Sequence, residues 1–214
     1  MKYYTRLYLI RHGRLINSHL NIYNGQRDIE LSPEGVSQTI GLSGWFKDKP
    51  ISAIYSSDLK RSYDGAKIIA VSLGLEVTQV AAFREINFGR WEGLTAEEIE
   101  KWYKEDWGRW MADIIYAKPT DGESLIGMQG RVIKRLRTLT KRHLGEEIIL
   151  YTHAGVNRAI LCHALNLNMK YCFRIQQDFC GVSIIDFHES TAVVRLMNWS
   201  PEYTLGLERI GKCV

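Results

Sequence analysis

Short apolar runs alternate with longer amphipathic segments along this chain, and that alternation constrains its fold more than any other feature. Buried strands are predicted at residues 6–10, 51–55, 75–80, 147–151, 182–187 and 192–197. Helices are predicted from Asp58 to Leu73, from Thr95 to about Tyr116, from Ser124 to His143 and from Val156 to Leu165, with another starting after the N-cap Ser32. This order predicts an α/β fold, a three-layer sandwich with helices on both faces of a mostly parallel sheet. The closing pair of strands supplies an antiparallel member, so the sheet is expected to be mixed.

The composition favours one domain in the cytoplasm. No linker rich in proline, glycine or serine interrupts the sequence, so residues 1–214 are expected to form a single domain. No apolar run is long enough for a membrane span, and the polar start does not resemble a signal peptide. A homodimer is compatible with these features. No CxxC pair occurs among the cysteines, which are expected to stay reduced: Cys162, Cys172, Cys180 and Cys213.

The mild net charge of +4 suits a small anionic substrate better than a nucleic acid. The basic residues from Arg131 to Arg142 follow the exposed side of an amphipathic helix, which indicates a solvated face. No GxxxxGK or GxGxxG motif occurs, so neither ATP nor a dinucleotide cofactor is expected.

Functional side chains follow the predicted strands. Ligands of open α/β sheets bind beyond the carboxyl ends of the strands. The first strand is followed by RHG, which contains Arg11 and His12, and the fourth by THAG, which contains His153. Arg61 lies one turn into the helix that follows the second strand, and Glu85 lies in the loop after the third. Each residue alone could be structural, but their joint occurrence predicts a site at one edge of the sheet.

These residue types suit phosphoryl transfer. Arg11 and Arg61 can bind the roughly two negative charges of a phosphomonoester through bidentate hydrogen bonds. A neutral imidazole is a competent nucleophile, and its pKa near neutrality leaves a useful fraction unprotonated. His153 would add to the stabilisation of the equatorial oxygens. Glu85 is the only acid among these motif residues that could protonate a leaving alkoxide.

The motif RHG comes directly after an apolar strand and is followed in order by SSDLKRS, REINFGRWEG, DGES and YTHAG. This series of motifs resembles the histidine phosphatase superfamily, which includes phosphoglycerate mutase-like enzymes. The resemblance covers roughly residues 5 to 165. It implies a phosphoric monoester hydrolase with no cofactor or metal, in which His12 is the phosphorylated nucleophile and Glu85 the proton donor and acceptor. Arg11, Arg61 and His153 would form the phosphate pocket.

The motifs depart from the family pattern at several positions. RHG is followed by Arg14 rather than by glutamate, and the asparagine often found a little further on falls at Ser18. Asn24 and Gly25 match a segment in which glycine lets the backbone approach the phosphate. Ala154 takes a glycine position, where its N–H can still donate. These five residues are the expected substrate contacts beside the catalytic groups.

The branch of the superfamily is indicated by the stretch after Glu85. That stretch is shorter than in phosphoglycerate mutases. The chain also resembles α-ribazole phosphatases of cobalamin biosynthesis, because it contains an ungapped LYLIRHG…NIYNG…LSPEG followed by FREINFGRWEG. Alternatives are a broad-specificity phosphatase, a fructose-2,6-bisphosphatase-like sugar phosphatase and a phosphoglycerate mutase. If α-ribazole 5′-phosphate is the substrate, its base is expected to stack on aromatic rings in the short stretch, namely Trp102, Tyr103, Trp107 and Trp110.

Two functions of other classes are alternatives to a phosphatase, namely a metal site and a non-catalytic binding module. A metal site built from His12, His153 and Glu85 is disfavoured because no HxxxH or HExxH spacing occurs and two nearby arginines would repel a cation. A non-catalytic module that binds phosphorylated ligands would be favoured by loss of His12 or Glu85, and both are present.

Overall fold

Six strands of the computed structural model, which describes residues 3–200, form one sheet in the order β3-β2-β4-β1-β5-β6. β5 runs in the direction opposite to that of the other five strands, so the sheet is mixed and mostly parallel, as predicted. Cys213 lies outside the described residues, and the other three cysteines are buried free thiols. The strands are β1 (Thr5–Arg11), β2 (Ile51–Ser56), β3 (Val77–Gln79), β4 (Glu147–Thr152), β5 (Val182–Phe187) and β6 (Ala192–Trp199).

The helices begin and end largely where the sequence signals place them. Ser32 accepts a hydrogen bond from the backbone N–H of Gly35 at 3.0 Å, and Ser124 caps α5 in the same way. Gly74 ends α2 in the left-handed conformation, with φ of 65°. The helices are α1 (Pro33–Trp45), α2 (Lys60–Leu73), α3 (Ala96–Trp102), α4 (Lys104–Ala112), α5 (Leu125–Arg142) and α6 (Ala154–Ala164).

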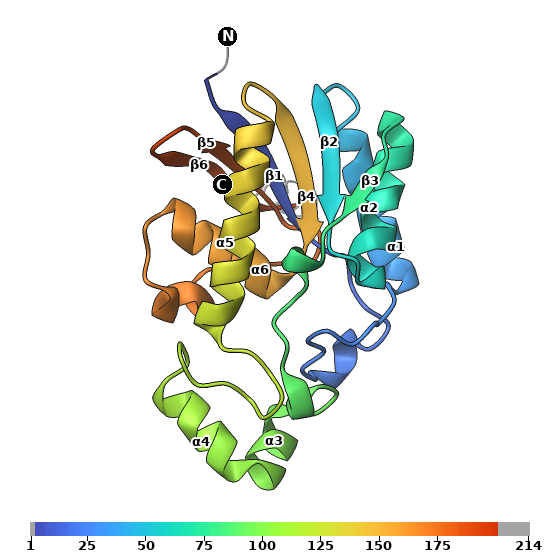
Figure 1. Cartoon of the computed structure of the whole chain (residues 1–214). Coiled ribbons are helices and arrows are strands. Elements are labelled where there is room, and N and C mark those ends of the chain that lie inside the picture. Colours follow the sequence, from blue (N-terminus) through green and yellow to red (C-terminus); the bar gives the residue numbers. More distant parts are fainter. Residues whose placement is uncertain (1–2, 201–214) are drawn as a thin grey trace, which may run out of the picture.

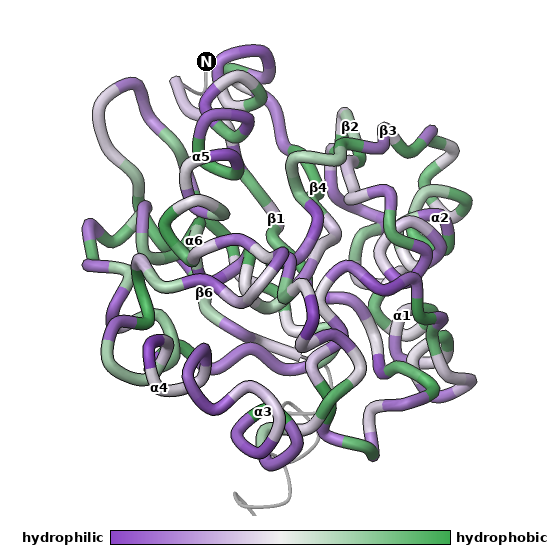
Figure 2. The backbone as a smooth tube through the Cα atoms, turned by 60° about the horizontal axis from the view of Figure 1, so that its bottom comes forward, coloured by the Kyte–Doolittle hydropathy of each residue, from purple (hydrophilic) through white to green (hydrophobic). Residues whose placement is uncertain are grey.

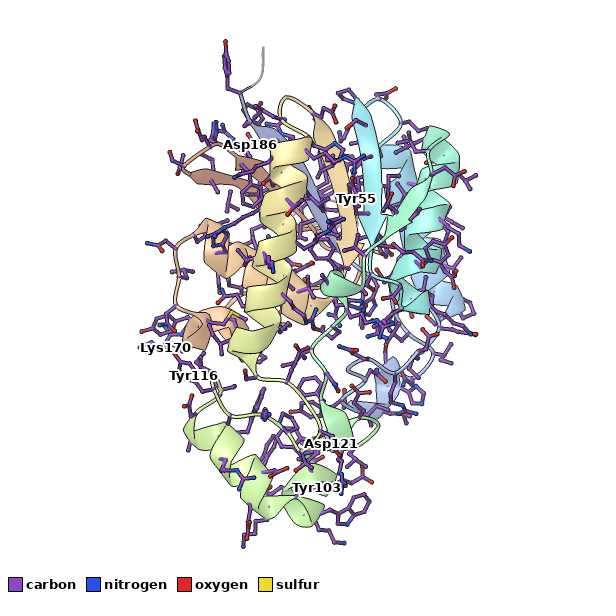
Figure 3. All side chains as sticks on the ribbon, viewed as in Figure 1. Tyr55, Tyr103, Tyr116, Asp121, Lys170 and Asp186 are labelled. Atoms are coloured by element: carbon purple, nitrogen blue, oxygen red, sulfur yellow. The ribbon has the colours of Figure 1, made fainter. Side chains whose placement is uncertain are left out.

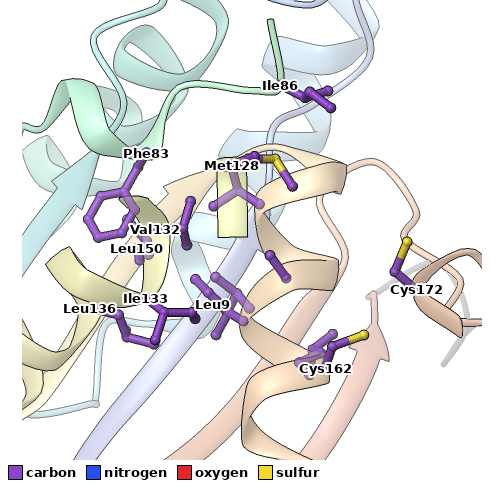
Figure 4. Packing of buried hydrophobic residues seen from close by; sticks show 14 of the residues in the cluster. Leu9, Phe83, Ile86, Met128, Val132, Ile133, Leu136, Leu150, Cys162 and Cys172 are labelled. Carbon is purple, nitrogen blue, oxygen red and sulfur yellow. The ribbon is translucent and has the colours of Figure 1, made fainter. Parts of the chain in front are cut away.

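Alternate residues of the central strands face two separate cores, because successive side chains of a strand point to opposite faces. Leu9 belongs to the cluster formed with α5 and α6, whereas Tyr8 and Ile10 belong to the cluster formed with α1 and α2. Figure 1 shows α5 and α6 in front of the sheet, and Figure 4 shows Val132 of α5 close to Leu9 and Leu150. The predicted three-layer sandwich is therefore confirmed.

The predicted single helix from Thr95 to Tyr116 is wrong. α3 ends at Trp102 and α4 begins at Lys104, and Tyr103 between them has the non-helical dihedrals φ −128° and ψ 41°. The break lets the apolar residues of two short helices, Ile99 and Trp110, reach the same core cluster. The two helices lie together beyond the sheet (Figure 1), with Tyr103 labelled at their junction in Figure 3.

The outer face of this helical pair is polar. α3 appears largely in the purple of hydrophilic residues when that end is turned forward (Figure 2), since its sequence, AEEIEKW, is mostly charged. Between residues 3 and 200, no helix combines the length and apolar character needed to cross a bilayer.

Candidate active site

A cavity of about 580 Å³ opens beyond the carboxyl ends of β1 and β4, at the edge of the sheet that the sequence indicated. Several of the predicted functional residues meet here. α6 begins at Ala154, two residues earlier than predicted, so the cavity also lies against the first turn of a helix. Of the predicted site residues, those that line the cavity are Arg11, His12, Ser18, Asn24, Gly25, Arg61, Glu85 and Ala154.

The ring of His12 is held in one tautomer. Its Nδ1 lies 2.8 Å from the carbonyl oxygen of Gly13, and because a carbonyl can only accept, Nδ1 carries the proton. Nε2 is therefore left with a lone pair. Burial, followed by the charges of Arg61 and Arg11, holds the pKa of His12 well below its usual value of 6.5. The imidazole is thus neutral and available as a nucleophile.

Three buried nitrogen atoms beside His12 have no hydrogen-bond partner among the described residues: Nε of Arg11, Nε of Arg61 and Nδ1 of His153. The ring of His153 is fully buried, and its centroid lies 5.4 Å from that of His12. Its Nε2 is 2.6 Å from the hydroxyl of Ser57. Buried polar nitrogens without partners cost free energy, and their concentration at one place is typical of an anion-binding site.

The two arginines are held by backbone carbonyl groups. Arg11 donates to the carbonyl oxygen of Gln177 at 2.6 Å, and its guanidinium lies 3.9 Å from the ring centroid of Phe179. Arg61 donates to the carbonyl oxygens of Arg27 and Gly25 at 2.6 and 2.5 Å. Burial lowers the pKa of Arg11 to about 10, so the group remains charged at neutral pH. Both guanidinium groups are therefore pre-positioned cations.

Glu85 lies across the cavity, with its carboxylate bound to two backbone N–H groups. Oε1 accepts from Ile86 at 2.9 Å and Oε2 from Gly155 at 3.0 Å. Glycine at position 155 lets the carboxylate stay here, since a Cβ at that position would lie 2.3 Å from Oε1 of Glu85. The glycine of the YTHAG motif therefore makes room for the acid.

Arg131 supports the loop that carries Glu85, and its prediction as part of a solvated face is wrong. Its guanidinium donates to the carbonyl oxygens of Ala82 and Arg84 at 2.8 Å and to that of Glu85 at 3.0 Å. The other side of the group pairs with the carboxylate of Glu123. Helical periodicity could not reveal this role, because it marks the outward side of α5 without showing which loop crosses it.

The predicted substrate contacts have different environments. The hydroxyl of Ser18 accepts from the N–H of Leu15 at 2.9 Å. Gly25 has φ of 51°, and a Cβ there would lie 2.0 Å from Oε1 of Glu92, so packing against Glu92 also requires glycine. Arg14 lies outside the cavity lining and pairs with Glu34 at 3.0 Å.

Sequence reasoning missed several polar residues of the cavity, among them Asn17, Asn21 and Arg158. Asn17 lines it beside Ser18, and its amide nitrogen donates to the side-chain oxygen of Asn24 at 2.8 Å. Arg158 lines it from the next turn of α6 after Ala154. Its position four residues after Ala154 was a signal, because residues i and i+4 share a helix face.

Two of the aromatic residues expected to stack on a substrate base, Trp107 and Trp110, pack against aromatic rings of other segments. Of the four, only Trp110 lines the cavity. Trp107 makes edge contacts with Tyr23 and Trp91, and the side chain of Trp102 is largely exposed. These rings fill the core between the helical pair and the sheet. The cavity's other aromatic residues come from different segments: Tyr23, Phe88, Phe173 and Phe179.

Metal-binding residues are not grouped in the described part of the chain, where no set of three or more His, Cys, Asp or Glu side chains could hold an ion. The cavity instead gathers guanidinium groups and imidazoles around His12. Such an arrangement can bind a phosphoryl group, offer it a neutral nucleophile and supply a proton from a carboxylic acid.

Comparisons with known proteins identify relatives of this chain. The family model of the histidine phosphatase superfamily (branch 1) matches residues 7–200. Phosphoserine phosphatase 1 of Hydrogenobacter thermophilus is 31% identical over 194 residues, which are 91% of this chain and 92% of the relative. The alpha-ribazole phosphatase from Shigella flexneri is 25% identical with a TM-score of 0.84, over 91% and 96% of the two chains. A phosphoserine phosphatase mutant from Entamoeba histolytica in complex with phosphoserine is 26% identical with a TM-score of 0.82, over 91% of this chain.

Proposed function

We propose that this chain, a phosphoric monoester hydrolase that belongs to the histidine phosphatase superfamily (branch 1), transfers a phosphoryl group to Nε2 of His12 and then to water. The single observation that carries these roles is the set of unpaired nitrogen atoms on Arg11, Arg61 and His153 beside a neutral imidazole. A phosphoryl group placed there would accept from all three residues. Its phosphorus would then lie next to the lone pair of His12.

In the first step, the lone pair on Nε2 of His12 forms a bond to phosphorus while the bond from phosphorus to the ester oxygen breaks. The leaving oxygen takes a proton from the carboxyl group of Glu85, and the product alcohol departs. In the second step, the oxygen of water forms a bond to phosphorus while the bond from phosphorus to Nε2 of His12 breaks, and Glu85 accepts a proton from the water. Inorganic phosphate leaves, and His12 and Glu85 return to their starting states.

The substrate is a small phosphorylated metabolite, and the relatives bear the names of two chemically different phosphatases, for phosphoserine and for α-ribazole. α-Ribazole 5′-phosphate remains a candidate, which would place the enzyme in cobalamin biosynthesis. The observation that favours it is the number of aromatic side chains in the cavity wall. Their rings could pack against a heterocyclic base.

The proposal is tested with p-nitrophenyl phosphate and His12→Ala. The variant is expected to lose turnover completely while its circular dichroism spectrum and melting temperature stay close to those of the wild type. Rapid acid-free quenching of the wild type with labelled substrate should trap an acid-labile adduct that is absent in His12→Ala. His188→Ala, in the turn between β5 and β6, is the matched control and should keep full activity. Near-normal activity of His12→Ala would overturn the assignment.

A further inference from the structure

Three arginines line the cavity, and the chemistry proposed above uses only two of them. The charged residues of the lining are Arg11, Arg61, Arg158 and Glu85. A phosphate carries about two negative charges, which the guanidinium groups of Arg11 and Arg61 match. One guanidinium charge is therefore left without a counterpart from the phosphate.

Arg158 projects from α6 one turn beyond the residues that contact the reacting end of the cavity. Because an α-helix rises 1.5 Å per residue, its Cα lies about 6 Å further along the helix axis than that of Ala154. The two residues are on the same face of α6 and line the same cavity. A group bound by Arg158 would therefore be separated from the phosphate by a few bonds.

The guanidinium of Arg158 is held in place, yet it keeps donors for a ligand. Its Nε donates to the carbonyl oxygen of Ile175 at 3.0 Å, and the group lies 5.4 Å from the ring centroid of Phe173. The two terminal nitrogens make no hydrogen bond to any residue between 3 and 200 that the structure records. They are the edge of the group that remains for recognition.

The wall around Arg158 is apolar. Met169 and Cys172 are buried at 4% and 1% exposure, and together with Phe173 they line this side of the cavity. An apolar wall offers no partners for the hydroxyl groups of a sugar. It also strengthens an ion pair by excluding water.

We propose that Arg158 binds a carboxylate of the substrate, so that the enzyme acts on a phosphorylated hydroxy acid or amino acid. The inference rests on the proposed function, since it assumes that the phosphate binds beside His12. A carboxylate carries one negative charge and accepts a bidentate pair of hydrogen bonds from one guanidinium. A second phosphate would carry about two charges and would leave one of them unmatched. A nucleoside monophosphate has no second anionic group for Arg158 to bind.

The test uses two substrates that differ only by the carboxylate: O-phosphoserine and O-phosphoethanolamine. The wild type is expected to show a kcat/KM at least tenfold higher for phosphoserine. Arg158→Met keeps the length of the side chain and is expected to lower kcat/KM for phosphoserine about 10- to 100-fold, the usual effect of losing a hydrogen-bonded charge. For phosphoethanolamine, the change should stay within about threefold. Arg158→Lys should recover part of the phosphoserine activity, since it restores a charge without the planar fork.

Arg174→Met is the matched control, because this neighbouring arginine contacts Tyr171 and does not line the cavity. It should leave both substrates unaffected. An equal loss for both substrates in Arg158→Met and Arg158→Lys would show that Arg158 serves the phosphate or the fold, and would overturn the inference. A tenfold preference for fructose 2,6-bisphosphate or α-ribazole phosphate over phosphoserine would overturn it as well.

These experiments distinguish failure of the proposed function from failure of the role proposed for Arg158. If the wild type hydrolyses p-nitrophenyl phosphate and phosphoethanolamine through His12 but gains nothing from the carboxylate, only the role of Arg158 is overturned. If His12→Ala retains activity, the site assignment itself falls, and the inference falls with it.

Discussion

The guanidinium of Arg131 donates a hydrogen bond of 3.0 Å to the backbone carbonyl oxygen of Glu85. Through this bond and those to Ala82 and Arg84, a helix on one face of the sheet sets the position of the loop that carries the proposed acid. Arg131 does not touch the cavity, so it is a positioning residue. Its contribution should depend on how much the reaction needs a proton from Glu85.

We therefore expect Arg131→Met to lower kcat for an alkyl phosphate by 10- to 100-fold and kcat for an aryl phosphate by less, because a shift of about 1 Å at a catalytic group can cost about a hundredfold. The measurement is the ratio of the two kcat values in single-turnover assays. Arg137→Met, on the exposed side of the same helix, is the control. A parallel loss with both substrates would indicate general destabilisation rather than displacement of the acid.

Replacement of Glu85 by glutamine should produce the same leaving-group pattern more strongly. General acid catalysis is typically worth about a hundredfold or more, and an activated aryl phosphate needs less of it. The rate of phosphorylation of His12, measured by rapid quench, should fall at least a hundredfold for an alkyl phosphate. Glu97→Gln changes an exposed acid of α3 and should have no effect. Equal losses for alkyl and aryl substrates would contradict the role of Glu85.

The single methyl group added in Gly155→Ala should lower kcat in the same way as the replacement of Glu85 by glutamine. The Cβ of Gly155→Ala would lie 2.3 Å from Oε1 of Glu85, which is the end of a flexible side chain and can move away. The fold should therefore survive with a melting temperature within a few degrees of the wild type, while kcat for an alkyl phosphate falls about tenfold or more. Gly130→Ala, where a Cβ meets nothing within 4 Å, is the control. Unchanged kinetics in Gly155→Ala would show that Glu85 works equally well from another position.

Acid should destabilise the fold through two of the buried histidines, His12 and His153. Burial, then the charge of Arg61, holds the pKa of both His12 and His153 well below 6.5. As the pH falls below 6.5, the unfolded chain therefore binds protons that the folded chain does not. Above pH 6.5 the two histidines therefore cause no loss of the free energy of unfolding. As the pH falls from 6.5 towards their folded-state pKa values, the free energy of unfolding decreases by up to about 1.4 kcal/mol per pH unit for each histidine.

Urea unfolding at about pH 7 and pH 5, in buffers without phosphate, measures this loss. His12→Asn removes one of the two groups and should lose less free energy of unfolding between these pH values than the wild type does. His188→Asn changes a half-buried histidine in the turn between β5 and β6, and this control should behave like the wild type. An identical pH dependence in His12→Asn would mean that His12 is protonated in the folded state.

Most of the fold could be predicted because its signals are local. The strand at residues 182–187 has the predicted bounds, and Ser32, Gly74 and Ser124 cap the helices as their types suggest. The residues at the strand ends could be predicted to meet because parallel strands bring their carboxyl ends to one edge. The break at Tyr103 could not, since two short helices and one long helix share the same periodicity, and only the packing of Ile99 and Trp110 distinguishes them.

The contacts of the site depended on elements far apart in the sequence. Arg131 and Glu85 are 46 residues apart, and nothing in helical periodicity connects an outward arginine with a distant carbonyl oxygen. Stacking of the tryptophans on a substrate base was an expectation only for α-ribazole 5′-phosphate as the substrate. The structure places Trp107 against Trp91 and Tyr23 instead, since burying a ring against other rings gains more than leaving it open to water.

The position of β1 in the sheet has a consequence for synthesis of the protein. Among the six described strands, the one that ends beside His12 is made before the others, yet its hydrogen-bonded neighbours are β4 and β5. A ribosome must therefore release residues 147–152 before this strand can pair, and residues 182–187 before it is enclosed on both sides. Chains interrupted before β4 contain His12, the proposed nucleophile, but have no sheet to hold it. Catalysis thus arises late in translation, and a truncated product should be cleared as an unfolded chain rather than act as a weakened enzyme.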